Sequence, residues 1–431
     1  MTTLLKNCTL ANKLNVNITI TDGTITAIGN QAKADKIIGI NGKTVLPGII
    51  DSHVHFREPG GEQKEDWLTG SMAAVAGGVT TVIDMPNNDP PITDLAALNK
   101  KRKLTKKSLV NFGFFFGATT NNIEEVRKVS GIAGIKIYVG SSTGNLLVAQ
   151  DDDIKKLMEI PNINWVIHAE DEELIRKNSQ QISENSNSAI HSQIRNRQVA
   201  MKGVERVIDL AKETNARIHI CHISTAEEVS LIKKAKNANL QITCEVSPHH
   251  LFLNDGAYEK FGNFVKVNPP LRTKKDNEAL LKGLNDGIID IIATDHAPHT
   301  IKEKETPYHD APAGIPEVQT SLPLMLNEVN KGTITIEQLI KIMSAQPAKL
   351  FSLQNKGLIA EGYDADITVV DMDKKQIINK EMLLSKCGWS PYENMKITGW
   401  PVMTFVNGNL VYDQGKINQQ FKGREITYGK I

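Results

Sequence analysis

Two histidines stand one residue apart in the stretch DSHVHFREPG, residues 51–60, directly after the apolar run TVLPGII. Side chains two positions apart in a β-strand point to the same face of the sheet. If this run is a strand, His53 and His55 therefore face one common space. Imidazole nitrogens are frequent metal ligands, so the spacing indicates a metal site at the end of this strand.

Other metal-ligating side chains recur at the ends of later β-type runs. They are His168 in INWVIHAED, His222 in RIHICHIST and Asp295 in IIDIIATDHAPH. In a parallel barrel the carboxyl ends of the strands lie on one side, so these residues are expected to converge with His53 and His55. Imidazole and carboxylate ligands suit zinc, and three or more of them with one open position make bound water acidic enough to supply hydroxide near neutral pH.

Lys136, in the run GIKIYVGSS, is the unusual member of the set. An ammonium group cannot bind a cation. A lysine amine that has captured carbon dioxide is a carbamate, however, and its two oxygens can bridge two metals about 3.5–4 Å apart, with a hydroxide between them. A plainer interpretation is a lysine whose stem packs while its charge reaches solvent.

Eight β-type runs position these residues, and most are followed by a segment with apolar residues at helical spacing. The runs are 45–56, 79–88, 109–120, 134–142, 163–171, 217–225, 240–250 and 288–299. Strands that alternate with helices imply parallel strands joined by crossovers, so the pattern predicts an α/β fold, a (β/α)8 TIM-like barrel over residues 49–346. That span is close to the about 250 residues typical of such barrels.

The two chain ends have a different pattern. Residues 1–48 contain short alternating runs with Asp-Gly turns, and residues 347–431 contain ADITVVDM and VMTFVNGNLVYDQGKI. Neither end alone is large enough for a good core. We therefore expect both ends to pair into one small composite β-sandwich domain beside the barrel.

Composition narrows the function classes. The 431 residues include 50 basic and 49 acidic ones, a net charge of +1, which gives no electrostatic argument for a nucleic-acid or membrane partner. The N-terminal stretch shows no secretory pattern, and no apolar run approaches the about 20 residues that span a bilayer. Four scattered cysteines without a C-x-x-C pair indicate reduced thiols, so a cytoplasmic protein is expected.

Eight motifs follow one another along the chain: HVHFREPG, DMPNN, GIKIYVGSSTG, IHAED, CHIST, CEVSPHHLFL, VNPPLR and ATDHAPH. Together they resemble the dihydroorotases of the amidohydrolase superfamily, in the long form with a flanking β-domain. The resemblance covers essentially the whole chain and implies two zinc ions per chain. The ligands that it implies are His53, His55 and Asp295 for one ion and His168 and His222 for the other, with N6-carboxylated Lys136 as the bridge.

One local departure bears on the bridge. Some long-form relatives use an aspartate just after the fourth barrel strand for this purpose. Here the neighbourhood is GSSTG, with Ser141 and Ser142 and no carboxylate. The departure favours Lys136 as the bridging residue.

The reaction that the resemblance implies is the reversible hydrolysis of L-dihydroorotate to N-carbamoyl-L-aspartate, a step of pyrimidine biosynthesis. The metals polarise the amide carbonyl and hold a bridging hydroxide as the nucleophile. Asp295 takes the proton of this hydroxide and passes it to the leaving ring nitrogen, first as base and then as acid. The implied substrate contacts are Arg57, Asn87 and His299 for the carboxylate, with His55 beside them, and Asn268, Ala313 and Gly314 for the amide edges of the ring.

Two other functions remain open. Hydantoinases, dihydropyrimidinases and allantoinases share the metal-ligand set, but they do not need a carboxylate-binding arginine and histidine, so Arg57 and His299 favour a dihydroorotase. A non-catalytic structural partner of aspartate transcarbamoylase would have lost metal ligands, whereas this chain keeps them all. A homodimer follows from family habit, and association with aspartate transcarbamoylase is compatible with either function.

Three further features have weaker signals. Cys221 precedes His222 and is expected to face the other way, as barrel packing, if the strand is regular. His191 belongs to no recognisable group of residues. The polar segment IKEKETPYHDAPAG, residues 301–314, is either a lid that excludes water or only a long connection.

Overall fold

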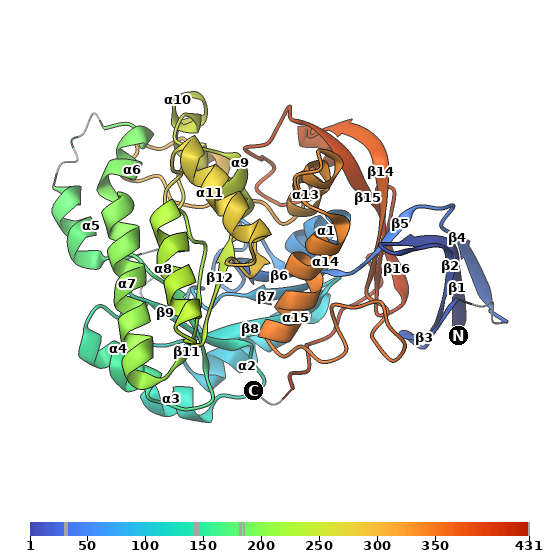
Figure 1. Cartoon of the computed structure of the whole chain (residues 1–431), viewed down its shortest axis with the longest axis horizontal. Helices are drawn as coiled ribbons and strands as arrows, with labels where there is room; N and C mark the ends of the chain where they lie inside the picture. The colour runs from blue at the N-terminus through green and yellow to red at the C-terminus, as the bar shows by residue number, and fades with distance from the viewer. Residues whose placement is uncertain (30–32, 142–145, 181–182, 184–185, 430–431) are drawn as a thin grey trace.

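The computed structural model describes all residues except 30–32, 142–145, 181–182, 184–185 and 430–431. A parallel sheet of eight strands forms a barrel, and a second, mostly antiparallel sheet lies beside it (Figure 1). The barrel strands are β6 Ile49–Val54, β7 Val79–Asp84, β8 Asn111–Gly117, β9 Gly134–Tyr138, β10 Asn164–His168, β11 Arg217–Ile220, β12 Ile242–Val246 and β13 Ile291–Ile292. They are hydrogen-bonded in chain order from β6 to β13.

The barrel closes between its first and last strands. Val54, at the end of β6, forms a parallel bridge with His296, just after β13. The backbone N–H of His55 also donates to the carbonyl oxygen of His296 over 2.8 Å. Each of the eight predicted β-type runs contains one of these strands. The predicted (β/α)8 TIM-like fold is therefore confirmed.

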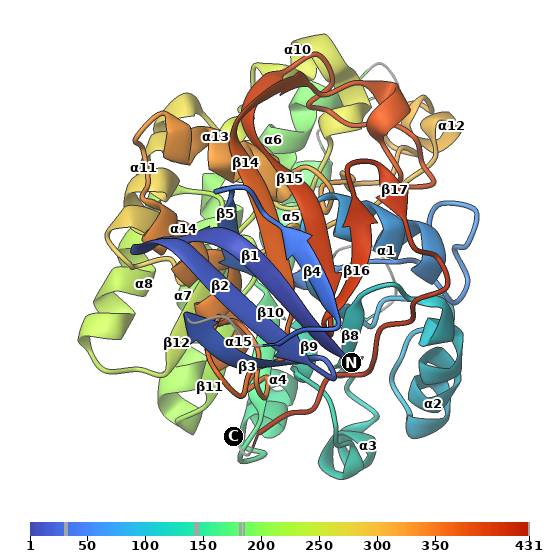
Figure 2. The same cartoon turned by 90° about the vertical axis from the view of Figure 1, so that its right-hand side faces the viewer.

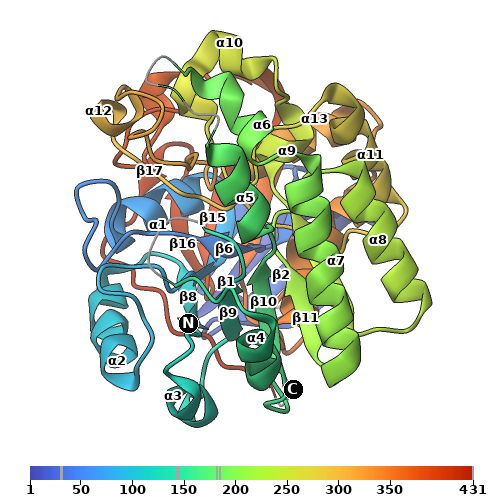
Figure 3. The same cartoon turned by 90° about the vertical axis from the view of Figure 1, so that its left-hand side faces the viewer.

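Helices cover the outside of the barrel, and Figure 3 shows α4, α5, α7 and α8 on one flank. The longer helices are α1 Trp67–Ala76, α2 Leu95–Leu104, α4 Asp151–Met158, α5 Glu172–Ser179, α7 Arg197–Thr214, α8 Ala226–Asn237, α11 Lys274–Asn285 and α13 Ser321–Asn330. In α7 the buried Val204, Val207 and Ala211 recur at intervals of three and four, which places them on one stripe facing the barrel. Thr225 and Glu228 form a capping box that begins α8.

Shorter helical segments occupy the connections. They are α3 Ile123–Lys128, α6 His191–Ile194, α9 Pro248–Phe252, α10 Ala257–Phe261, α12 Ile301–Lys304, α14 Ile336–Ile340 and α15 Gln346–Leu350. Single helical turns cover η1 Thr105–Lys107, η2 Ser188–Ile190, η3 Gly262–Val265, η4 Lys341–Ala345 and η5 Lys380–Met382. Among the helices of the described residues, none is long and apolar enough to cross a membrane.

Both chain ends build the second sheet (Figure 2). Its strands are β1 Thr2–Leu10, β2 Lys13–Thr21, β3 Thr24–Gly29, β4 Lys36–Gly39, β5 Thr44–Pro47, β14 Ile367–Ile377, β15 Lys396–Val406, β16 Asn409–Asp413 and β17 Lys416–Ile417. β5 joins the two sets of strands because it pairs with β1 on one side and with β14 on the other. Leu5, Ile18, Ile367 and Phe405 pack into one buried apolar core. The termini thus form one β domain, as predicted, and its two halves belong to a continuous sheet.

Parts of the C-terminal segment leave this sheet and contact the barrel. Trp389 Nε1 donates to the carbonyl oxygen of His299 over 2.8 Å, and the Tyr392 hydroxyl donates to Glu317. Glu425 forms a parallel bridge with Phe112 in β8. The division of the chain at residues 48 and 347 stays a prediction, because segments after residue 347 contact both parts.

Candidate active site

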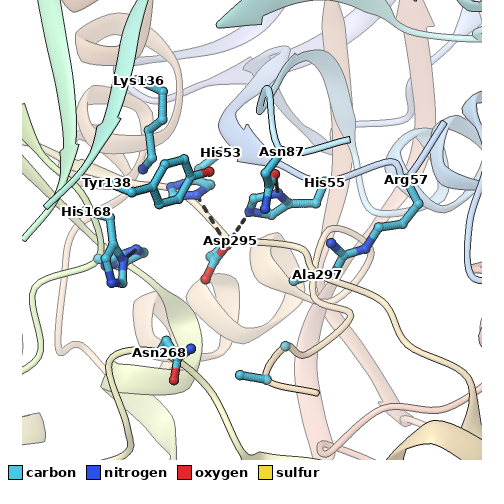
Figure 4. Close-up of a pocket in the computed structure, with 13 residues that line it drawn as sticks. His53, His55, Arg57, Asn87, Lys136, Tyr138, His168, Asn268, Asp295 and Ala297 are labelled. Carbon is cyan, nitrogen blue, oxygen red and sulfur yellow. Dashed lines mark hydrogen bonds and ion pairs between the residues drawn. The ribbon is translucent and has the colours of Figure 1, made fainter. Parts of the chain in front are cut away.

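A pocket opens where the barrel strands end (Figure 4). It is lined by His53, His55, Arg57, Asn87, Lys136, Tyr138, His168, His222, Asn268, Asp295, Ala297, Ala313 and Gly314. Every residue that the sequence assigns to the site lies in this lining except His299, which contacts Arg57. Tyr138 and Ala297 complete the lining and are absent from the prediction. The structure brings these residues together, while the role of each stays a prediction.

Asp295 lies between His53 and His55, as Figure 4 shows. Its Oδ1 is 3.2 Å from His53 Nε2 and 2.8 Å from His55 Nε2. Ligands bound at about 2.0–2.1 Å to one tetrahedral zinc ion lie roughly 3.3 Å apart, so these atoms have the spacing of ligands to one ion. One ligand atom from each of His53, His222 and Asp295 also lies within 4.8 Å of the others. This donor set can hold a metal ion.

The charges in this group favour a cation. Burial would raise the pKa of Asp295, but His53 and His55 outweigh it and hold the pKa below its usual range. Burial would likewise lower the pKa of His53, but Glu245 and Asp295 raise it to about 10. Burial lowers the pKa of His55 to about 4, so this imidazole is neutral. A metal ion bound here would take the place of the His53 proton.

His168 and His222 form a second group. His168 Nδ1 lies 3.1 Å from His222 Nε2, again close to the separation of two ligands on one ion. Burial lowers the pKa of both rings, which keeps them in the neutral form that binds metals. Lys136 enters the same pocket from β9, and its Nζ donates to Cys221 Sγ over 2.8 Å.

Each histidine of the first group is held at its other nitrogen. His53 Nδ1 pairs with Glu245 in β12, and the second oxygen of this carboxylate accepts from His219 Nε2 over 3.1 Å. His55 Nδ1 lies 2.6 Å from Asn87 Oδ1, and it would donate to this oxygen once a metal ion takes the Nε2 lone pair. Such partners fix the ring orientation and leave the Nε2 lone pair for a metal ion. Asn87 can therefore orient His55 in addition to its expected contact with the substrate.

A cluster of donors lies beside the metal-ligand residues. Arg57 is buried, and its Nε donates to the carbonyl oxygen of Pro298 over 3.1 Å. His299 Nε2 lies 3.1 Å from the Ala313 carbonyl oxygen, and its Nδ1 lies 3.2 Å from Lys64 Nζ. A lysine ammonium group can only donate, so Nδ1 accepts from Lys64 and the single ring proton lies on Nε2, which faces the Ala313 carbonyl oxygen and is also 3.1 Å from Arg57 Nη2. Lys64 Nζ also forms an ion pair with Glu303 over 2.7 Å, so Arg57 is the cation in the pocket lining that can bind a carboxylate, with His299 beside it.

Asn268 lies across the pocket from Lys136 (Figure 4), and Ala313 and Gly314 line the same pocket. Gly314 has a φ of 146°. A Cβ atom at this position would lie 2.3 Å from the carbonyl oxygen of Ala297, so only glycine fits. The backbone N–H of Gly314 donates to the Lys266 carbonyl oxygen over 2.9 Å and its carbonyl oxygen accepts from Lys304 over 3.0 Å, so this backbone is held in place beside the pocket.

Cys221 corrects one expectation, because it does not face away from the site. β11 ends at Ile220, and His222 has a positive φ of 33°, so strand alternation stops before Cys221. The cysteine still packs inside the barrel, but its sulfur lies beside Lys136. The part of GSSTG that begins at Ser142 lies outside the described residues.

Sequence reasoning missed several residues that contact this site. Glu245 had a signal, since it is an acidic residue inside the otherwise apolar strand ITCEV. Lys64 had none, because it stands among other charged residues in GEQKED. In the sequence, Tyr138 resembles any aromatic residue of a β-strand. Only the structure shows that it lies at the end of β9 and lines the pocket.

Lys101 in α2 supports the loop that carries Asn87. Its Nζ donates to the carbonyl oxygen of Met85 and to Asn88 Oδ1, each over 2.8 Å, and it forms an ion pair with Asp84. Asp84 in turn accepts from the backbone N–H of Phe56 over 2.7 Å, next to the His55 strand end. The ion pair between Lys101 and Asp84 therefore links the segment after β6 to the segment after β7. Both side chains are fully buried.

We expect Lys101→Met to lower the free energy of unfolding by about 3–5 kcal/mol, because it leaves the Asp84 carboxylate buried without its partner. Denaturant unfolding followed by circular dichroism measures the loss. Lys103→Met, at an exposed position of the same helix, is the control and should change stability by less than about 0.5 kcal/mol. Equal stability of the two variants would contradict the assignment.

Comparison with known proteins gives four findings. The Amidohydrolase family matches residues 44–411. A protein of Methanosarcina acetivorans named dihydroorotase is 41% identical over 418 residues, which cover 93% of this chain and 89% of that protein. A dihydroorotase of Bacillus cytotoxicus is 37% identical over 419 residues, which cover 92% and 94%. Among solved structures, L-hydantoinase (dihydropyrimidinase) from Arthrobacter aurescens matches with a TM-score of 0.94 and 31% identity, over 99% of both chains.

Proposed function

This chain belongs to the amidohydrolase family and, within it, to the dihydroorotases, and we propose that the pocket at the ends of its barrel strands is where it opens the ring of L-dihydroorotate. The enzyme hydrolyses this cyclic amide reversibly to N-carbamoyl-L-aspartate, a step of pyrimidine biosynthesis. The position of Arg57 in the same pocket as the candidate metal ligands, with His299 in contact with it, carries the assignment of the site. The substrate has a carboxylate on the same small ring as the amide bond that breaks, and this cluster is built to bind one.

Two zinc ions per chain complete the proposed site. The ligands are His53, His55 and Asp295 for one ion and His168 and His222 for the other, with N6-carboxylated Lys136 as the bridge. The spacing of the donor atoms within each group supports this arrangement, as does the presence of the buried Lys136 in the lining of the same pocket. Bound metals would supply the positive charge that polarises the amide carbonyl and would make the attacking water acidic.

The chain's own residues move the proton and hold the substrate. Asp295 is deprotonated at rest, since His53 and His55 lower its pKa, so it can accept a proton from the attacking water and deliver it to the leaving nitrogen. The proposed contacts to the substrate carboxylate are Arg57, Asn87 and His299, with His55 beside them. The proposed contacts to the ring are Asn268 and the backbone of Ala313 and Gly314.

A hydantoinase or dihydropyrimidinase is the second candidate, because the fold match to L-hydantoinase is close. Hydantoin and dihydrouracil carry no carboxylate, so neither ring would use the donors of Arg57 and His299. Purified, zinc-loaded enzyme incubated with L-dihydroorotate tests the proposal. Formation of N-carbamoyl-L-aspartate supports it, whereas turnover of hydantoin alone would favour the second candidate.

We expect Lys64→Met to raise the KM for L-dihydroorotate about tenfold, with a smaller change in kcat. The substitution removes one positive charge and the donor to His299 Nδ1, and a charge-assisted hydrogen bond has a net effect of this order. Steady-state kinetics measure the change. Lys302→Met, at an exposed position of α12, is the control. A lower kcat with an unchanged KM would contradict a role in binding.

The proposed assembly is a homodimer in the cytoplasm, and association with aspartate transcarbamoylase is a further arrangement that the family suggests. Light scattering of the purified enzyme, alone and mixed with that transcarbamoylase, measures both. A monomer that does not bind the transcarbamoylase would contradict both proposals.

A further inference from the structure

His191 lies outside the pocket lining, yet it contacts a pocket residue. It begins α6, and its ring is buried. Its Nε2 lies 2.9 Å from the Val267 carbonyl oxygen and 2.9 Å from Asn268 Oδ1. Its Nδ1 lies 2.9 Å from the Tyr308 hydroxyl. The imidazole thus connects the irregular segment around Asn268 to the segment of residues 301–314.

The partners of His191 determine its tautomer. The Val267 carbonyl oxygen can only accept, so Nε2 carries the proton. Nδ1 is then an acceptor, and the Tyr308 hydroxyl donates to it. Burial, together with the nearby Arg195 and Lys266, lowers the pKa of His191 to about 3, so the ring holds a single proton near neutral pH.

This tautomer also determines how the Asn268 amide is turned. The single Nε2–H group of His191 is shared between the Val267 carbonyl oxygen and the amide oxygen of Asn268, each 2.9 Å from Nε2, so Oδ1 faces His191 and the Nδ2 group is left for the pocket. An amide nitrogen can only donate. Asn268 therefore presents hydrogen-bond donors to a bound ring, which match a ring carbonyl oxygen and do not match a ring N–H.

We propose that His191 is a positioning residue that turns the Asn268 amide so that it donates to a carbonyl oxygen of the substrate ring, an inference that rests on the proposed function. Tyr308 extends this relay into the segment that also carries Ala313 and Gly314. Lys266 Nζ donates to the carbonyl oxygens of Tyr308 and Ala311, over 2.7 and 2.5 Å. The backbone N–H of Gly314 donates to the Lys266 carbonyl oxygen over 2.9 Å. One connected network therefore sets both contacts to the ring.

Paired substitutions of His191 and Asn268 test the relay. His191→Leu removes the donor, and His191→Gln retains an N–H group at a similar reach. We expect His191→Leu to lower kcat/KM for L-dihydroorotate about tenfold and His191→Gln to restore most of the loss, in line with one hydrogen bond misplaced. In the Asn268→Ala background, His191→Leu should change kcat/KM by less than about twofold, because its effect passes through Asn268. Tyr308→Phe, which keeps the ring, should lower kcat/KM about threefold.

A purely structural role gives a different pattern. His191→Leu would then lower kcat/KM by the same factor with and without Asn268, and His191→Gln would not restore it; either result overturns the relay. If His191→Leu fails to fold, judged by circular dichroism, Tyr308→Phe decides: a threefold loss that disappears in the Asn268→Ala background supports the relay, and no loss overturns it. A folded, metal-loaded wild-type enzyme without activity on L-dihydroorotate would refute the proposed function, and the relay with it.

Discussion

Asp295→Asn should lower kcat for L-dihydroorotate hydrolysis by about three to four orders of magnitude, the range of a lost general acid–base group. Asparagine keeps an oxygen that can lie near His53 and His55, but it cannot accept the proton of the attacking water. The wild-type carboxylate is 3.2 Å from His53 Nε2 and 2.8 Å from His55 Nε2, and these neighbours hold its pKa below the usual range. The basic form is therefore present throughout the neutral pH range.

Kinetics and metal analysis on the same sample separate the two roles of this residue. Asp152→Asn, at an exposed position of α4, is the matched control and should keep the wild-type kcat. A variant that retains its metals but loses kcat identifies a proton-transfer role. Asp295→Asn with full metal content and more than a tenth of the wild-type kcat would contradict the assignment.

Lys136→Ala should have an effect of similar size for a different reason. Lys136 is buried in the pocket and, as a carbamate, would be the side chain shared by the two metal ions. Without it we expect the zinc content to fall from about two ions per chain to one or fewer. Since metals supply several kcal/mol of charge stabilisation, kcat should fall at least about a thousandfold.

Adding a small carboxylic acid to Lys136→Ala gives a second test of the bridging role. The alanine variant leaves space where the lysine stem and its carbamate would lie, so added acetate or propionate should restore part of the zinc content and of the activity. Lys275→Ala, at an exposed position of α11, is the control and should not respond to these acids. An alanine variant with two zinc ions and normal kcat would show that Lys136 is not the bridge.

The fold and the inner part of the site could be predicted because both depend on local patterns. Each barrel strand lies within one apolar run, and parallel strands bring their carboxyl ends to one side. His53, His168 and Asp295 therefore had to meet once the runs were recognised. The motifs that resemble dihydroorotases added Arg57 and Asn268, which no spacing argument alone would have selected.

The outer part of the site could not be predicted, because it depends on contacts between distant segments. Lys64 and His299 are far apart in the chain, and so are His191 and Tyr308. Nothing in the residues around His191 distinguishes it from an ordinary helix histidine. The direction of the Cys221 side chain could not be predicted either. It was inferred from the alternation of side chains along a regular strand, and the positive φ of His222 shows that the regular strand has ended.

Fold similarity alone does not decide the substrate. The L-hydantoinase structure overlays almost the whole of this chain but is 31% identical to it in sequence. The dihydroorotase of Methanosarcina acetivorans is 41% identical to this chain. The two activities act on similar cyclic amides, so the metal groups serve either one. The residues that distinguish the two substrates must therefore lie where the substrate rings differ, at the carboxylate. Arg57 lies in the same pocket as the candidate metal ligands, and His299 contacts Arg57; both side chains have hydrogen-bond donors for a carboxylate.

The most direct test of this account compares L-dihydroorotate with 5,6-dihydrouracil, the same ring without the carboxylate, on one preparation of zinc-loaded enzyme. A carboxylate bound by charge-assisted hydrogen bonds from Arg57 and His299 should contribute at least a hundredfold in kcat/KM. We therefore predict that L-dihydroorotate is preferred by that factor or more, and that Arg57→Met removes most of the preference. Equal turnover of the two rings, or a preference for dihydrouracil, would contradict the account.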